Sequence, residues 1–242
     1  MSLPRVFVVG ATGYTGRHLV RACAERGVAT VAHVRPDSPR LAEWRRELSG
    51  MDAEVDETPW QPDAMRDALL RHRPTHVFIL LGTTRARAKQ AARKGRPPET
   101  YESVDYALPH LLVEAAREAA LVDASLRPVL VYLSALGVRE DSRLAYVRVR
   151  GKLERELRES GLPWLVVRPS FITGADRGER RPLERLTAAT VDALLAPLAL
   201  LGAGRLRGRY GSITGEALAR GLVHVALDER LTGRVVLADE LR

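Results

Sequence analysis

Residues 8–20 read VVGATGYTGRHLV, and this stretch decides the fold. An apolar run over 5–10 ends in Gly10, and a helical pattern follows it after a short turn. Gly10, Gly13 and Gly16 stand three residues apart across that turn. In such a motif the first glycine permits the tight strand-to-helix turn, the next lets backbone amides approach a pyrophosphate, and the last lets the helix pack closely. The stretch therefore predicts a dinucleotide-binding loop at a helix N-terminus, with an ordinary tight turn as the alternative.

Short apolar runs typical of buried strands alternate with helical patterns over most of the chain. Strands are expected at 5–10, 30–35, 53–57, 76–84, 128–137, 164–170 and 233–239. Helices are expected at 15–27, 64–73, 101–120, 144–160 and 214–228. Asp63 is expected to cap the second helix, and Pro109 either kinks the third or marks its true first turn.

This alternation predicts an α/β fold, a Rossmann-type doubly wound parallel sheet with helices on both faces. We expect residues 1–242 to form a single domain. After Ser170 the alternation loosens, and residues 171–234 are expected to contribute a small cap on the substrate side, over the carboxyl ends of the strands.

Composition and charge narrow the function classes. The chain has 242 residues, 45% of them apolar, and this is enough for one sizeable core. No apolar run reaches the roughly 18 to 20 residues that span a bilayer, and no signal peptide is recognised. The lone Cys23 excludes internal disulfides and cysteine-rich zinc sites, so a cytoplasmic protein without a metal site is expected. The net charge of +8 is spread along the chain, which favours small anionic ligands over nucleic acid.

Five further motifs follow the glycine loop in order: LGTTR, SVDYALPHLLVEAA, LSALG, AYVRVRGKLE and VVRPS. With the G-x-x-G-x-x-G spacing, they resemble the short-chain dehydrogenase/reductase superfamily in its extended and atypical branches. The branch that they resemble in particular contains the Tat-interacting proteins and the NmrA-like proteins. The resemblance covers about residues 5–175.

The end of the second strand bears on the choice of dinucleotide. NAD-binding sheets place an acidic residue there to bond the ribose 2′-hydroxyl, but this chain has Arg35 within HVRPDS. A guanidinium pairs with a 2′-phosphate, so NADP is expected rather than NAD, with a solvated surface arginine as the alternative. The predicted cofactor-binding residues are Gly10, Thr12, Gly13, Tyr14, Thr15, Gly16, Arg35, Gly82, Thr83, Arg150 and Pro169.

The resemblance also implies a catalytic set of Ser, Tyr and a Lys four residues after the Tyr. Ser134 and Tyr146 match the first two, as substrate-orienting group and general acid/base, but position 150 is Arg. Arg150 is expected to anchor the ribose, although it cannot serve in a proton relay as a lysine does. Lys152 lies six residues after Tyr146, about 120° round the helix, and cannot readily take over.

Two functions stay open. One is an NADP-dependent oxidoreductase or epimerase-like enzyme acting on a small-molecule substrate. The other is a non-catalytic regulator or scaffold that senses NADP(H), which the Lys-to-Arg exchange favours. The cationic stretch 85–96 is either a lid over phosphates or a solvated loop. An oligomer is possible, and neither nucleic acid nor membrane is expected as a partner.

Overall fold

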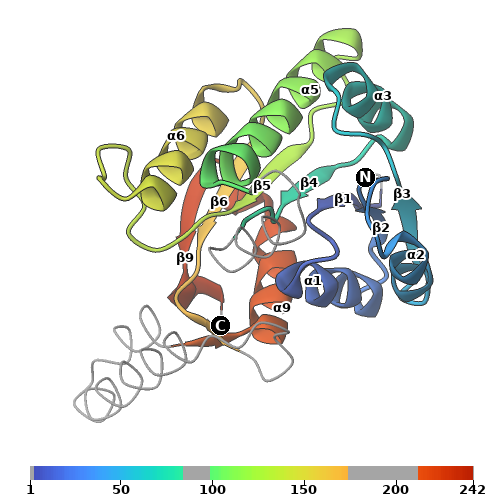
Figure 1. Ribbon diagram of the computed structural model, residues 1–242, viewed down its shortest axis with the longest axis horizontal. Helices are drawn as coiled ribbons and strands as arrows, with labels where there is room; N and C mark the ends of the chain where they lie inside the picture. The colour runs from blue at the N-terminus through green and yellow to red at the C-terminus, as the bar shows by residue number, and fades with distance from the viewer. Residues whose placement is uncertain (1–2, 84–98, 174–211, 242) are drawn as a thin grey trace.

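The computed structural model of the chain describes residues 3–83, 99–173 and 212–241. Its main feature is a seven-stranded parallel sheet with the strand order β3-β2-β1-β4-β5-β6-β9 (Figure 1). The strands are β1 Arg5–Val9, β2 Ala29–His33, β3 Ala53–Asp56, β4 His76–Ile79, β5 Val129–Leu133, β6 Trp164–Arg168 and β9 Arg234–Leu237. The predicted Rossmann-type doubly wound α/β fold is therefore confirmed, with the strand order reversing between β1 and β4.

Helices cover both faces of the sheet (Figure 1). One layer consists of α1 Tyr14–Glu25, α2 Leu41–Ser49 and α9 Gly215–Ala226, and the other of α3 Pro62–His72, α5 Leu108–Val122 and α6 Ala145–Glu159. Alternate residues of β1 serve the two cores: Val6 and Val8 pack in the first, Phe7 and Val9 in the second. Burial on both faces explains why this strand reads as a nearly continuous apolar run.

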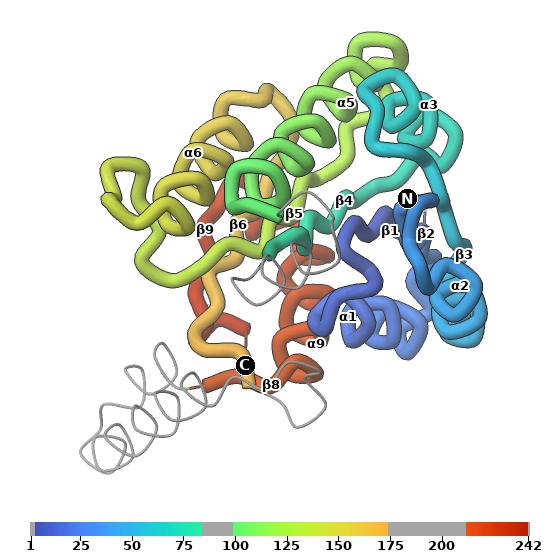
Figure 2. The backbone as a smooth tube through the Cα atoms, viewed as in Figure 1, coloured from blue at the N-terminus to red at the C-terminus, as the bar shows by residue number. Residues whose placement is uncertain are grey.

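The path of the chain places the two halves on opposite sides of the switch point. Figure 2 shows the blue β1–β3 on one side of β4 and the orange and red β6 and β9 on the other. A separate two-stranded parallel sheet joins β7 Ile172–Thr173 to β8 Ile213–Thr214. Short helical turns complete the described chain: η1 Tyr101–Ala107, a π-helical turn, and the 3₁₀ turns η2 Glu229–Leu231 and η3 Ala238–Leu241.

Part of the segment expected as a cap belongs to the main body. The helix α9 packs along α1, and its Leu218 and Leu222 are buried in the core of that layer. The strand β9 extends the sheet beside β6. Helix α9 belongs to the main body because its apolar face covers the sheet, and β9 belongs to it because it is the last strand of that sheet. The rest of the expected cap, 174–211, lies outside the described residues.

Two local features differ from the sequence-based expectations, and a third decides between two alternatives. Helix α2 was not predicted, because Leu48 is its one fully buried side chain and its apolar pattern is correspondingly weak. Asp63 does not cap α3: the N-cap is Gln61, and Pro62 takes the first helical position, where its missing N–H costs nothing. Pro109 lies in the first turn of α5, directly after the π-helical turn η1, so the second of the two alternatives holds.

Candidate functional site

The glycine loop forms the sharp turn that its spacing predicts. Gly10 has φ +85°, a left-handed conformation that favours glycine, and its carbonyl accepts the Gly13 N–H at 2.9 Å. Gly13 is the N-cap of α1 and has no side chain to fill the helix end. A Cβ at Gly16 would overlap the Gly10 carbonyl oxygen, so the helix lies as close to the turn as glycine permits. Thr12 lies in the turn and Thr15 in the first helical turn.

This helix end suits an anion. The first turn of α1 contains no acidic residue, and the first N–H groups of a helix carry a partial positive charge. A pyrophosphate placed there meets backbone amides and no carboxylate from that turn. The residues present therefore fit a dinucleotide.

Tyr14 connects the glycine loop to distant segments. Its hydroxyl donates a hydrogen bond to the Thr173 carbonyl at 3.2 Å, and its ring fills the space that a Cβ at Gly215 would need. The loop is thereby fixed to β7 and to the start of α9. Sequence spacing gives no signal for this contact, because Tyr14 and Thr173 are separated by 159 residues.

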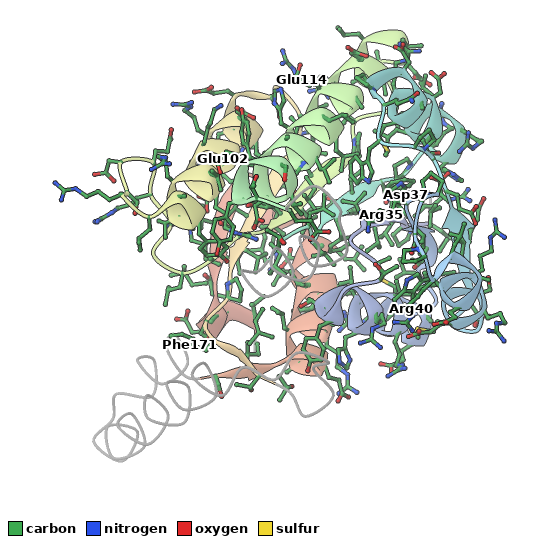
Figure 3. All side chains as sticks on the ribbon, in the orientation of Figure 1. Arg35, Asp37, Arg40, Glu102, Glu114 and Phe171 are labelled. Atoms are coloured by element: carbon green, nitrogen blue, oxygen red, sulfur yellow. The ribbon has the colours of Figure 1, made fainter. Side chains whose placement is uncertain are left out.

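Arg35 lies two residues beyond the end of β2. Its Nε is 3.5 Å from Asp37 Oδ1, and the two side chains are 46% and 77% exposed, so the guanidinium is accessible to a ligand (Figure 3). The pair is solvated and weak, since exposed ion pairs contribute little. Its role as the 2′-phosphate ligand stays a prediction.

Gly82 and Thr83 follow β4 and are held by groups from other elements. The Thr83 N–H donates to Asp105 Oδ2 at 2.8 Å, and the Thr83 hydroxyl donates to Glu99 at 3.1 Å. A Cβ on Gly82 would stand 2.8 Å from Arg150 Nη2. Glycine is needed here because the Arg150 guanidinium lies against the backbone.

The Arg150 side chain, 7% exposed, reaches from α6 to the ends of two strands. Its Nη1 donates to the Leu133 carbonyl at 2.8 Å and to the Tyr132 hydroxyl at 3.2 Å. Its Nη2 donates to Asp105 Oδ1 at 2.8 Å and to the Leu81 carbonyl at 3.3 Å. The four Nη hydrogens of a guanidinium are thus all used. These bonds direct the guanidinium to the backbone at the ends of β4 and β5, and its role as the ribose anchor stays a prediction.

Burial and charge act against each other within this cluster. Burial raises the pKa of the Asp105 carboxyl, against the opposing influence of the Arg150 charge and the Thr83 N–H. The pKa of Arg150 stays above its ordinary range although burial acts to lower it, because Tyr132, Tyr146 and Asp105 outweigh that effect. Burial also raises the pKa of Tyr132, so its hydroxyl remains protonated and acts as a neutral acceptor for Arg150.

Tyr146 lies one helical turn before Arg150 on α6. The guanidinium carbon of Arg150 is 4.8 Å from the centre of the Tyr146 ring, and the Tyr101 ring meets it edge-on at 5.3 Å. Lys152 points elsewhere: its Nζ stands 3.9 Å from the ring centre of Tyr106. The six-residue spacing correctly indicated that Lys152 does not take the place of a lysine at position 150.

Ser134 begins the loop after β5, where its N–H donates to the Val167 carbonyl at 2.8 Å. Its hydroxyl donates to Glu154 Oε1 at 2.6 Å. Arg168 holds the same carboxylate with two hydrogen bonds, at 3.0 and 2.6 Å, and Arg158 adds one at 2.8 Å. Pro169 comes directly after Arg168, the last residue of β6.

The register of the sheet brings most of the predicted residues to one edge. Val9 pairs with both His33 and Ile79, Ile79 with Tyr132, and Leu133 with Val167, so the carboxyl ends of these strands coincide. The glycine loop and Arg35 lie at one end of this edge. Gly82, Thr83, Ser134, Tyr146 and Arg150 gather at the other.

Sequence reasoning missed two buried carboxylates, Asp105 and Glu154. Glu154 had a signal: Arg150, Glu154 and Arg158 follow one another at four-residue spacing and therefore share a helix face. Asp105 had none, because its partners come from residues 83 and 150.

Residues 3–83, 99–173 and 212–241 also bear on metal binding and on membrane insertion. There, no group of three or more His, Cys, Asp or Glu residues could hold a metal ion. Within the same residues, no helix is long and apolar enough to cross a membrane. The cationic stretch 85–96 lies outside the described residues.

Comparison with known proteins gives the family. The model of a family described as NAD(P)H-binding matches residues 10–192 of the 242. The chain belongs to this NAD(P)H-binding family. The expected cofactor class, a nicotinamide dinucleotide, agrees with it, whereas the choice between NAD and NADP is a finer matter.

Solved structures agree on the fold. A putative NAD-dependent epimerase/dehydratase from Bacillus halodurans superimposes with a TM-score of 0.66 at 16% identity, and 98% of each chain is covered. A UDP-glucose 4-epimerase from Thermus thermophilus in complex with NAD gives 0.61 at 17% identity, with 98% of this chain and 80% of that one covered. At these identities the likeness shows a shared fold.

Curated relatives are more similar in sequence. Protein FMP52, mitochondrial, from Debaryomyces hansenii is 29% identical over 169 residues, which is 69% of this chain and 66% of that protein. Protein fmp52-1, mitochondrial, from Aspergillus terreus is 29% identical over 181 residues, 74% of this chain and 71% of that protein.

The names of these relatives correct one expectation. A cytoplasmic location was expected from the composition and the lone cysteine, and it is contradicted because the relatives are named as mitochondrial proteins. The cysteine argument excludes a disulfide-rich secreted protein but does not distinguish one reducing compartment from another.

Proposed function

We propose that the chain binds NADP(H) and acts as an oxidoreductase or epimerase-like enzyme of the atypical short-chain group, on a small carbonyl or hydroxyl substrate. The observation that carries the proposal is the start of α1, where the glycine turn and the uncapped Gly13 present backbone N–H groups to a phosphate. Within the superfamily, we place the chain in the branch of the Tat-interacting and NmrA-like proteins. We further propose that the chain forms a single domain, with neither nucleic acid nor membrane as a partner.

The chain's own residues take the following roles in the reaction. Bound NADP(H) supplies or accepts a hydride. Tyr146, as general acid/base, exchanges a proton with the substrate oxygen at its hydroxyl. The Ser134 hydroxyl donates a hydrogen bond to Glu154, so its oxygen is left to accept a hydrogen bond from a substrate hydroxyl and thereby orients it. Pro169, directly after β6, contributes to the cofactor site.

The cofactor preference is tested at Arg35. We expect Arg35→Glu to raise the Kd for NADPH at least tenfold more than the Kd for NADH, because a carboxylate there repels a 2′-phosphate. Fluorescence titration with both nucleotides measures the two constants. Arg117→Glu, an exposed charge reversal on α5, is the matched control and should leave both unchanged. Equal losses for the two nucleotides in Arg35→Glu would remove the 2′-phosphate assignment.

Catalysis is tested at Tyr146. We expect Tyr146→Phe to lower turnover of a carbonyl substrate by 10²-fold or more, the usual contribution of a general acid, while the Kd for NADPH changes less than threefold. The measurement is NADPH consumption at 340 nm against a panel of small aldehydes and ketones. Tyr101→Phe, which keeps the neighbouring ring, is the control. Turnover that survives in Tyr146→Phe contradicts its role.

One observation favours the non-catalytic alternative, an NADP(H)-sensing regulator or scaffold. The position of the family lysine is occupied by Arg150, whose Nη donors are committed to Asp105 and to backbone and tyrosine oxygens. A sensor binds NADPH with no consumption over the whole carbonyl panel. An enzyme consumes it with at least one substrate class.

A further inference from the structure

We propose that Asp105 is a positioning residue: by fixing the Arg150 guanidinium, it holds the loop after β4 and the ring of Tyr146 in the arrangement that the site requires. The inference rests on the proposed function for its meaning, since the positioned groups are those of the nucleotide site. It gives Arg150 a part other than contact with the ribose.

The first support is that the two oxygens of the Asp105 carboxylate bind different elements. The side chain is fully buried. Oδ1 accepts from Arg150 Nη2 at 2.8 Å and Oδ2 accepts from the Thr83 N–H at 2.8 Å. One buried group from η1 therefore connects α6 to the loop after β4.

The second support is what Arg150 does with its remaining donors. The bonds to the Leu81 and Leu133 carbonyls attach the guanidinium to the loop after β4 and to the last residue of β5. Gly82 allows it to approach, because a side chain there would meet both Nη2 of Arg150, at 2.8 Å, and Oδ1 of Asp105, at 3.3 Å. The pair thus joins η1, α6 and two strand ends at one point.

The third support is energetic. Removing two charges from water is costly, and a buried ion pair is often no more stabilising than apolar residues of the same size. A planar guanidinium whose four Nη hydrogens are directed at separate acceptors fixes positions more strictly than apolar packing does. The Tyr146 ring lies on this fixed cation at 4.8 Å, so the pair determines where the ring stands.

The experiment separates position from stability with one set of variants. Arg150→Met leaves the Asp105 charge buried without its partner. Asp105→Asn leaves the Arg150 charge buried without its partner. The double variant removes both charges, while the Asn oxygen still accepts from Thr83. Thermal unfolding gives Tm, NADPH fluorescence gives Kd, and amide hydrogen exchange without nucleotide gives the protection of the Thr83 N–H.

We expect each single variant to lower Tm by roughly 10 °C, since breaking a buried pair is strongly destabilising. The double variant should recover at least half of that loss. Its Kd for NADPH should nevertheless remain at least tenfold above wild type, and its Thr83 amide should exchange at least tenfold faster. Arg150→Lys keeps the charge, so its Tm should stay near that of the wild type. Because a lysine cannot span all the acceptors, its Kd for NADPH should lie between those of the wild type and the double variant.

Arg155→Met is the matched control, because Arg155 is an exposed arginine of the same helix that pairs with Glu140. It should change neither Tm nor Kd appreciably. A double variant that binds NADPH and protects Thr83 as wild type does would overturn the inference and leave the pair a stabilising contact only. Wild-type protein that binds neither NADPH nor NADH would instead refute the proposed function, and the Thr83 exchange would still decide the inference.

Discussion

Gly16→Ala is expected to abolish measurable dinucleotide binding and to lower the free energy of unfolding by about 3 kcal/mol, the upper range for overpacking. The new Cβ would overlap the Gly10 carbonyl oxygen and stand 2.8 Å from Ala11 Cα. Both obstacles are backbone and cannot rotate away, so α1 must move from the sheet and its N-terminus from the phosphate position. Urea unfolding and NADPH titration measure the two effects.

Substitutions at two other glycines serve as comparisons for Gly16→Ala. At Gly27 a Cβ would meet no atom within 4 Å, and the cost of Gly27→Ala is that of its φ of +64° alone, about 1 kcal/mol, with NADPH binding unchanged. A Cβ at Gly13 would stand 3.1 Å from the Gly10 oxygen, so Gly13→Ala should still fold. It should bind NADPH more weakly than the wild type does. If Gly16→Ala bound NADPH within threefold of wild type, the glycine turn would not be the phosphate site.

Glu154→Ala is the second substitution with a large expected effect, a loss of about 3 kcal/mol in the free energy of unfolding. The Glu154 side chain is 1% exposed and accepts hydrogen bonds from Ser134, Arg158 and Arg168. Its removal leaves a cavity, a buried hydroxyl without this acceptor, and both Arg158 and Arg168 without this carboxylate. Urea unfolding measures the loss.

The control for this prediction is Glu159→Ala on the same helix. The Glu159 side chain is 67% exposed and stands 3.9 Å from Arg155, so its removal should change stability by less than about 0.5 kcal/mol. Glu154→Gln keeps the volume and should fall between the two. A loss below about 1 kcal/mol for Glu154→Ala would show that Arg168 and Ser134 find other partners or water, and that the carboxylate is not what organises them.

The two halves of the site were predictable to different degrees. The glycine turn follows from local rules: the strand run before it, the three-residue spacing and the helical pattern after it involve neighbouring residues only. The position of Tyr146 relative to Arg150 and Lys152 also followed, because helical geometry fixes it. The ion pair between Arg150 and Asp105 could not be predicted, since the two residues are 45 positions apart and meet only when η1 packs on α6.

The sequence by itself determined the α/β class, the alternation of strands and helices, and the place of the phosphate loop. Each of these depends on periodicity and on glycine at defined spacings, which act over a few residues. Tertiary structure decided that α9 covers the sheet beside α1, that Ser134 donates to Glu154, and that the arginine at position 150 turns to the strand ends. Those outcomes depend on which polar groups are buried together, and a buried charge takes the partner that the packing of distant segments brings to it.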